Sequence, residues 1–118
     1  MKLYKWRKQA KYVHHFLKEL FTERDEFAIA FLSKVFLHFK MDFSPIPVIR
    51  KEEAQKIQTP IHIIAADKDL LFPGVKMLKR AKEIFPSSGE VLLLNHSKHV
   101  PGQKGNEEIV DFIKNHAK

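Results

Sequence analysis

Two short apolar runs without a helical stripe stand out in the second half of the chain. Ile61–Ala66 contains three isoleucines and begins directly after Pro60, and residues 91–94 read Val-Leu-Leu-Leu. Apolar runs of this length are typical of strands that are buried on both faces. Each run gives way to polar residues, around Asp69 in the first case and His99 in the second. The pattern therefore predicts two buried strands, each followed by a polar loop.

The residues between these runs have helical spacing. Val75, Leu78, Ala81 and Ile84 recur every three or four positions, and the other face is basic, with Lys76, Lys79, Arg80 and Lys82. A strand, helix and strand in this order predict parallel strands joined by a right-handed crossover. Residues 101–105 read as a loop, and Asn106 is expected to cap a final helix. Residues 50–118 therefore form a predicted β-α-β-α unit.

The first half of the chain has a helical pattern. An apolar stripe from Leu3 to Leu20 predicts an amphipathic helix that ends near Phe21. Thr22 and Asp25 resemble a capping box and predict that a second helix starts there and continues to about Phe39. That helix has apolar residues all around it, so it needs partners on more than one side. Core or subunit interface is the favoured explanation for its phenylalanines, and the lining of an acyl pocket is the alternative.

A connector separates the two halves. Pro45 and Pro47 exclude a helix and favour an extended backbone, and a short helix is expected at residues 51–57. We therefore divide the chain into a helical, cap-like segment with its connector, residues 1–49, and an α/β part, residues 50–118.

Composition limits the class of protein. A chain of 118 residues makes one domain at most, and without cysteine it has no disulfide. No continuous apolar stretch predicts a signal peptide or a membrane span, so the default expectation is a cytoplasmic protein that does not bind membranes.

The net charge of +7 is concentrated near the start, in Lys2, Lys5, Arg7, Lys8 and Lys11. No aromatic-interleaved loop, zinc-ligand spacing or recognition-helix pattern accompanies these cations, so we interpret them as a solvated basic face and expect no nucleic-acid partner. His14, His15 and His38 have no second pair at metal-ligand spacing. No metal or cofactor is predicted.

The two polar loops carry the candidate chemistry. Because the carboxyl ends of parallel strands meet at one edge of a sheet, Asp69 and His99 are expected on the same edge. A carboxylate beside an imidazole fixes its tautomer and stabilises its protonated form, which makes the histidine a usable general base. Asp67 and His96 lie in the same loops and are alternatives for these roles.

The spacing of these residues resembles the C-terminal part of the α/β-hydrolases, closest to the carboxylesterase-like members. The acid loop of that family usually reads glycine, two residues, aspartate and, four residues later, proline. This chain has Ala66 in place of the glycine, then Asp69 and Pro73, and the turn Ser-Lys-His-Val-Pro around His99 matches the family's histidine turn. The resemblance implies a partial α/β-hydrolase fold, with Asp69 as the triad acid and His99 as the triad base.

The family's nucleophile is missing from this sequence. In α/β-hydrolases the serine lies in G-x-S-x-G, upstream of the acid and the histidine. The chain has no such segment, and no glycines flank its serines in that pattern: Ser33, Ser44, Ser87, Ser88 and Ser97. The resemblance therefore implies a C-terminal fragment that is inactive alone and takes a small ester-type substrate only when completed.

A sheet of two strands leaves one edge of the Ile61–Ala66 strand without a neighbour. We therefore expect a homodimer, in which these edges pair or the phenylalanine-rich helices exchange. The first alternative is one half of a split hydrolase that a complementing chain completes. The second is a noncatalytic dimeric interaction module whose basic N-terminal helix binds an acidic partner.

Overall fold

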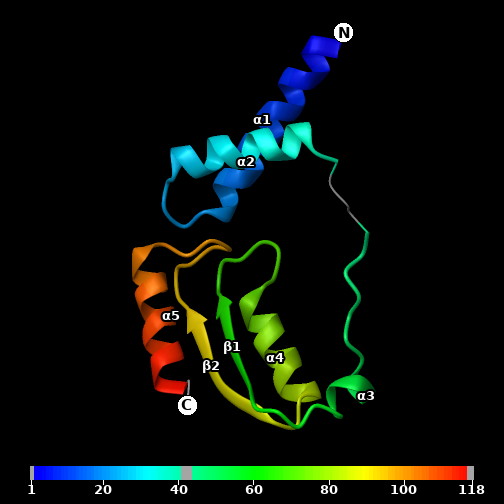
Figure 1. Cartoon of the computed structure of the whole chain (residues 1–118), viewed down its shortest axis with the longest axis vertical. Helices are drawn as coiled ribbons and strands as arrows, with labels where there is room; N and C mark the ends of the chain where they lie inside the picture. The colour runs from blue at the N-terminus through cyan, green and yellow to red at the C-terminus, as the bar shows by residue number, and fades with distance from the viewer. Residues whose placement is uncertain (1, 41–43, 117–118) are drawn as a thin grey trace.

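The computed structural model describes residues 2–40 and 44–116, and it combines helices with a two-stranded parallel sheet (Figure 1). The elements follow one another in the order α1 (Lys2–Leu20), α2 (Glu26–His38), α3 (Lys51–Ala54), β1 (Ile61–Ala66), α4 (Gly74–Ile84), β2 (Ser88–Leu94) and α5 (Gln103–His116). The predicted α/β class and the parallel strands are confirmed. None of the helices in the described ranges is long and apolar enough to cross a membrane.

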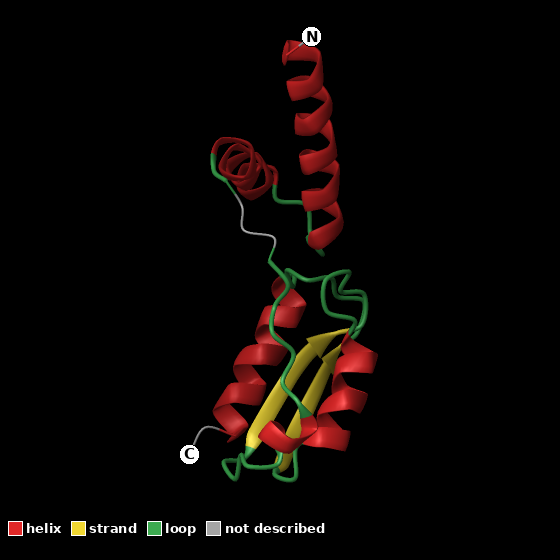
Figure 2. Cartoon of the chain, turned by 90° about the vertical axis from the view of Figure 1, so that its right-hand side faces the viewer, coloured by secondary structure: helices red, strands yellow, loops and turns green. Residues whose placement is uncertain are grey.

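The two strands lie between α4 and α5 (Figures 1 and 2). Ile63 of β1 is opposite Val91 of β2, and the register continues to Ala66 opposite Leu94. β2 begins at Ser88, three residues before the predicted run, because the backbone is already extended before the first large apolar side chain. The carboxyl ends of both strands point to the same edge of the sheet, where the polar loops begin.

α4 packs on the sheet through a stripe that runs from Gly74 through Leu78, Ala81 and Ile84. Val75, which was expected on this stripe, lies beside it and is 62 % exposed. At Gly74 the helix touches the end of β1: a Cβ atom there would lie 2.3 Å from the carbonyl oxygen of Ala66. Only a residue without a side chain permits this approach.

α1 and α2 form a helical hairpin with a core of its own. Leu17, Leu20 and Ile29 are buried, and partly buried apolar residues surround them: Val13, Phe21, Leu32 and Phe36. The expectation that Thr22 starts α2 is wrong. Asp25 is the N-cap, because its carboxylate accepts a hydrogen bond from the Ala28 amide at 2.9 Å.

The end of the hairpin is joined to the loop after β2. The Val100 amide donates to the Leu20 carbonyl at 2.8 Å, and the Thr22 amide donates to the Val100 carbonyl at 3.0 Å. The Thr22 side chain, expected to cap a helix, instead donates to the Val100 carbonyl at 2.8 Å. We refer to these contacts as the Thr22–Val100 junction.

Two other helix boundaries differ from the prediction. α5 starts at Gln103, so residues 103–105 are helical and Asn106 lies inside the helix. The cap comes from the distant Glu23, whose carboxylate accepts the Gln103 amide at 2.9 Å, and local sequence carries no sign of such a cap. α3 is shorter than the predicted 51–57 helix and ends at Ala54.

Candidate active site

Asp69 is held in place by the loop that follows β1. Its Oδ1 accepts the amides of Leu71 at 2.8 Å and Phe72 at 3.0 Å, the local pattern by which an aspartate stabilises a turn. Pro73 then leads into α4. Because Oδ1 is occupied by amides, Oδ2 remains for another partner, and the side chain as a whole is only 9 % exposed.

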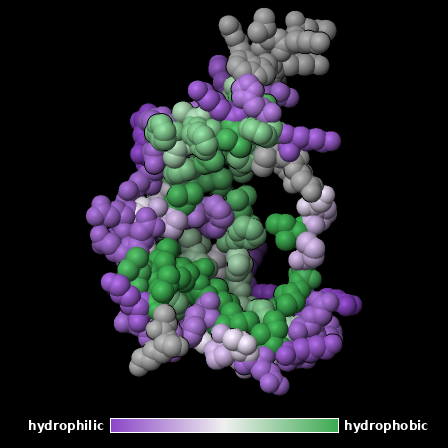
Figure 3. Space-filling view, in the orientation of Figure 1, coloured by the Kyte–Doolittle hydropathy of each residue, from purple (hydrophilic) through white to green (hydrophobic). Residues whose placement is uncertain are grey.

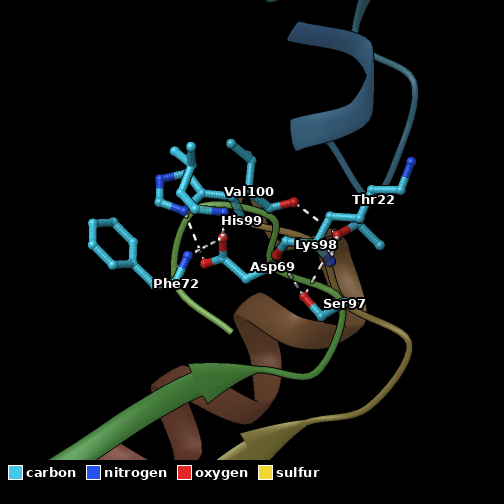
Figure 4. Close-up of polar contacts among 8 residues, drawn as sticks. Thr22, Asp69, Phe72, Ser97, Lys98, His99 and Val100 are labelled. Atoms are coloured by element: carbon cyan, nitrogen blue, oxygen red, sulfur yellow. Dashed lines mark hydrogen bonds and ion pairs between the residues drawn. The ribbon is translucent and has the colours of Figure 1, made fainter. Parts of the chain in front are cut away.

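That partner is His99, which the loop after β2 brings to Asp69. The imidazole Nδ1 lies 2.9 Å from Oδ2 of Asp69 (Figure 4). Since an ionised carboxylate can only accept, Nδ1 carries the hydrogen and Nε2 keeps a lone pair. Nothing in the described part of the chain hydrogen-bonds Nε2. The pair thus presents a basic nitrogen with its tautomer fixed, on a side chain that is 35 % exposed.

The carboxyl of Asp69 is ionised at neutral pH. Partial burial on its own raises its pKa, but the hydrogen bonds from two backbone amides and from His99 together hold the pKa below the ordinary value of an aspartate. A persistent negative charge beside Nδ1 stabilises the imidazolium that forms when Nε2 takes up a proton.

Asp67 and His96, the alternatives for these roles, are joined through the backbone of His96. The carboxylate of Asp67 accepts the His96 amide at 2.9 Å and the Ser97 amide at 3.0 Å. His96 has a φ of 56°, in the left-handed region that is costly for a residue with a Cβ atom. Asp67 therefore fixes a strained turn and ties the loop after β2 to the end of β1, which sets the position of His99.

We expect Asp67→Asn to lower stability at neutral pH. The His96 amide is the main cause that lowers the pKa of the Asp67 carboxyl in the folded chain. A folded pKa below the unfolded value, about 3.9, contributes stability above that pH and loses it as the pH falls through the folded value. In urea unfolding, the wild type should have a higher free energy of unfolding than the variant at pH 7. This difference should disappear below about pH 4. If wild type and variant differed in free energy of unfolding by the same amount at pH 7 and pH 3, this role for the carboxylate would be contradicted.

Three residues near the pair were not anticipated from the sequence. Thr22 accepts the Lys98 amide at 2.9 Å and so supports the His99 turn from the hairpin side. The Phe72 ring lies beside the imidazole, with 5.9 Å between ring centroids. Ser97 is 3 % exposed, and Figure 4 shows it on the other side of the loop from the His99 ring. Thr22 and Ser97 carry no local signal, because their roles depend on contacts between distant segments.

A small hollow of about 290 Å³ opens beside the pair, lined mainly by apolar residues that include Ile64, Phe72, Met77 and Leu94. It is large enough for a short acyl or alkyl group. A larger hollow of about 930 Å³ lies between the start of α2 and α5 and contains several carboxylates but neither member of the pair. Within the described ranges no group of three or more histidine, cysteine or acidic side chains is placed to hold a metal ion.

The arrangement offers a base for proton transfer, the His99 imidazole, oriented by the ionised Asp69 carboxylate, and within the described ranges no nucleophile contacts it. Compared with protein-family models, with curated proteins and with solved structures, the chain matches none of them.

Proposed function

We propose that this chain is the acid–histidine half of an esterase-like serine α/β-hydrolase, with Asp69 as the acid and His99 as the base. The observation that carries the proposal is the 2.9 Å contact between Nδ1 of His99 and Oδ2 of Asp69. The contact lies past the carboxyl ends of two parallel strands, which is where open α/β proteins place their sites. The loop spacing from Asp69 to Pro73 supports the same family.

The proposed reaction is acyl transfer through a serine ester. As a serine oxygen attacks the ester carbonyl, its proton passes to Nε2 of His99, and the Asp69 carboxylate stabilises the imidazolium. The imidazolium then gives this proton to the departing alcohol. In the second half-reaction Nε2 takes a proton from water, whose oxygen attacks the acyl-serine. The imidazolium then gives this proton to the departing serine oxygen, and the acid is released. Each half-reaction returns the pair to its starting state.

In the proposed enzyme the serine comes from another polypeptide segment, because none of the five serines lies in a G-x-S-x-G segment. The hydroxyl of Ser33 donates to the Ile29 carbonyl, and that of Ser87 donates to the carbonyls of Ile57 and Thr59. Ser97 donates to the Lys98 carbonyl and is buried. None of these three hydroxyls contacts the imidazole, so we expect the chain alone to be inactive.

The test is reconstitution with a serine half. The chain is co-expressed with an esterase segment that carries G-x-S-x-G and ends before its own acid strand, and turnover of p-nitrophenyl butyrate is measured. Neither partner should hydrolyse the ester alone, and the mixture should. If the chain alone hydrolysed the ester and His99→Ala removed that activity, it would contain its own nucleophile and the proposal of a half-site would have to be abandoned.

The second candidate is a noncatalytic dimeric interaction module, and α2 favours it. Phe27 and Phe31 are 84 % and 59 % exposed on the side of α2 that does not face α1. An apolar helix face of this kind is typical of a subunit interface. Sedimentation at micromolar concentration should give a dimer that Phe27→Lys with Phe31→Lys dissociates, and a clean wild-type monomer would exclude this candidate.

A further inference from the structure

One edge of β1 has no neighbouring strand in the described part of the chain. In the described sheet β1 has β2 as its neighbour on one side only. The amides of Ile61 and Asp67 point toward β2, where they donate to Ser87 and Leu94. Because alternate residues of a strand point to opposite edges, the amides of His62, Ile64 and Ala66 face the open side. Only another extended backbone can pair such a row of donors and acceptors in full.

The two faces of β1 beside this edge are hollowed differently. On the α4 side a hollow of about 510 Å³ is lined almost wholly by carbon atoms, with Ile61 and Ile63 from β1, Met77 from α4 and Ile49 from the connector. On the α5 side a hollow of about 230 Å³ is lined by His62 and Ile64 from β1 and by His116 and two apolar residues of α5. Alternate side chains of an added strand would enter these two hollows in turn.

The charges beside the open edge of β1 indicate which kind of polypeptide could bind there. Lys76 and Arg80 of α4 lie on the wall of the apolar hollow, and no described carboxylate is within ion-pair distance of either. On the other face Nδ1 of His62 accepts the Glu90 amide at 3.0 Å, so its Nε2 carries a hydrogen and is a donor. The edge thus presents cations and a hydrogen-bond donor, which suit carboxylates and carbonyl oxygens.

A second copy of this chain does not complement that charge. A symmetric pair of β1 edges is antiparallel about a two-fold axis perpendicular to the sheet, which places both α4 helices on the same face. α4 carries Lys76, Lys79, Arg80 and Lys82 against the single Glu83. Two such helices side by side would repel each other.

We propose that the open edge of β1 binds an extended, acidic segment of a different polypeptide as a third strand, with its aliphatic side chains in the hollow beside α4 and its carboxylates at Lys76 and Arg80. Figure 3 shows hydrophobic surface along the lower part of the opening between the connector and the rest of the molecule. The inference goes beyond the proposed function, because strand binding requires no chemistry at His99. If the hydrolase proposal is correct, the segment belongs to the serine half.

The probe is a fluorescent peptide of about eight residues, the length of an ordinary strand, in which valine alternates with threonine and two aspartates close each end. We expect micromolar binding by fluorescence anisotropy. A version that ends in lysines should bind roughly three- to tenfold more weakly at low salt, and less of that difference should remain at high salt. A version N-methylated on both edges should not bind, because neither of its edges can then pair with β1.

Variants of the chain supply the matched comparison. Ile64→Pro removes an amide that points to the open edge and leaves the pairing with β2, so it should fold and not bind, whereas Ile64→Val should bind like wild type. Lys76→Glu with Arg80→Glu should reverse the preference between the acidic and basic peptides. If Ile64→Pro fails to fold, this reversal is the test of whether the peptide binds beside α4.

Three results would overturn the proposal. One is equal peptide binding by wild type and a folded Ile64→Pro chain. Another is no binding of any peptide by a monomeric wild-type chain. The third is a wild-type dimer that Ile64→Pro dissociates while the peptide does not bind, which would make a second copy the occupant. Loss of peptide binding would leave the hydrolase proposal standing, because that proposal depends on turnover with a serine half.

Discussion

A chain with Gly74→Ala is expected to lose most of its folding stability. The new Cβ atom would lie 2.3 Å from the carbonyl oxygen and 2.8 Å from the carbonyl carbon of Ala66. Both atoms belong to the backbone of β1, so no side chain can rotate away, and α4 must separate from the sheet. Overpacking of this kind costs about 3 kcal/mol or more, a large part of the stability of a small domain. Urea unfolding followed by circular dichroism measures the loss.

Gly105→Ala is the matched control. Gly105 lies inside α5, where its added Cβ would meet the Pro101 side chain at 3.0 Å. A helix interior favours alanine over glycine by about 1 kcal/mol, which offsets a tight contact with a side chain. The control should therefore stay close to wild type. If Gly74→Ala unfolded at the same urea concentration as Gly105→Ala, the close approach of α4 to β1 would be wrong.

In a reconstituted hydrolase, Asp69→Asn is expected to lower kcat by a factor on the order of 10³–10⁴. An asparagine can still accept the amides of Leu71 and Phe72 through its oxygen. Its other atom is then an NH₂ group, which donates to Nδ1 of His99 and forces the hydrogen onto Nε2. The imidazole would hold the wrong tautomer to accept the serine proton. His99→Ala should cause a loss at least as large, because it removes the base itself.

His96→Ala separates this effect from general damage to the loops. His96 contacts Asp67 through its backbone amide, which the substitution keeps. We therefore expect kcat within a few-fold of wild type for His96→Ala, with assembly of the two halves unchanged for all three variants by sedimentation. Equal activity of Asp69→Asn and wild type in the assembled enzyme would exclude Asp69 as the triad acid.

The sequence predicted the α/β part better than the connections to it. The strand Ile61–Ala66 was predicted to the residue, because its apolar run is bounded by Pro60 and by the polar loop that starts at Asp67. The two loops of the candidate site follow from the rule that parallel strands end at one edge. Which carboxylate meets which histidine was decided by family resemblance, and the structure brings Asp69 to His99.

The missed features depend on contacts between distant segments. Thr22 has the residue type and position of an N-cap, yet its hydroxyl binds Val100 because the hairpin ends against that loop. Residues 101–105 have a proline and two glycines and read as a loop, but Glu23 caps the helix that starts at Gln103. Neither partner lies within a local window of sequence, so periodicity and capping rules do not reveal the contact.

The Thr22–Val100 junction has a consequence for biosynthesis. Its two residues are 78 positions apart, so the ribosome completes α1 and α2 long before it adds the segment on which they dock. Because the hairpin has a core of its own, we expect it to begin folding as it emerges. Until Val100 follows, the Leu20–Thr22 end of the hairpin remains uncovered. We therefore expect this end of the nascent chain to stay open to chaperones until the loop after β2 has been added.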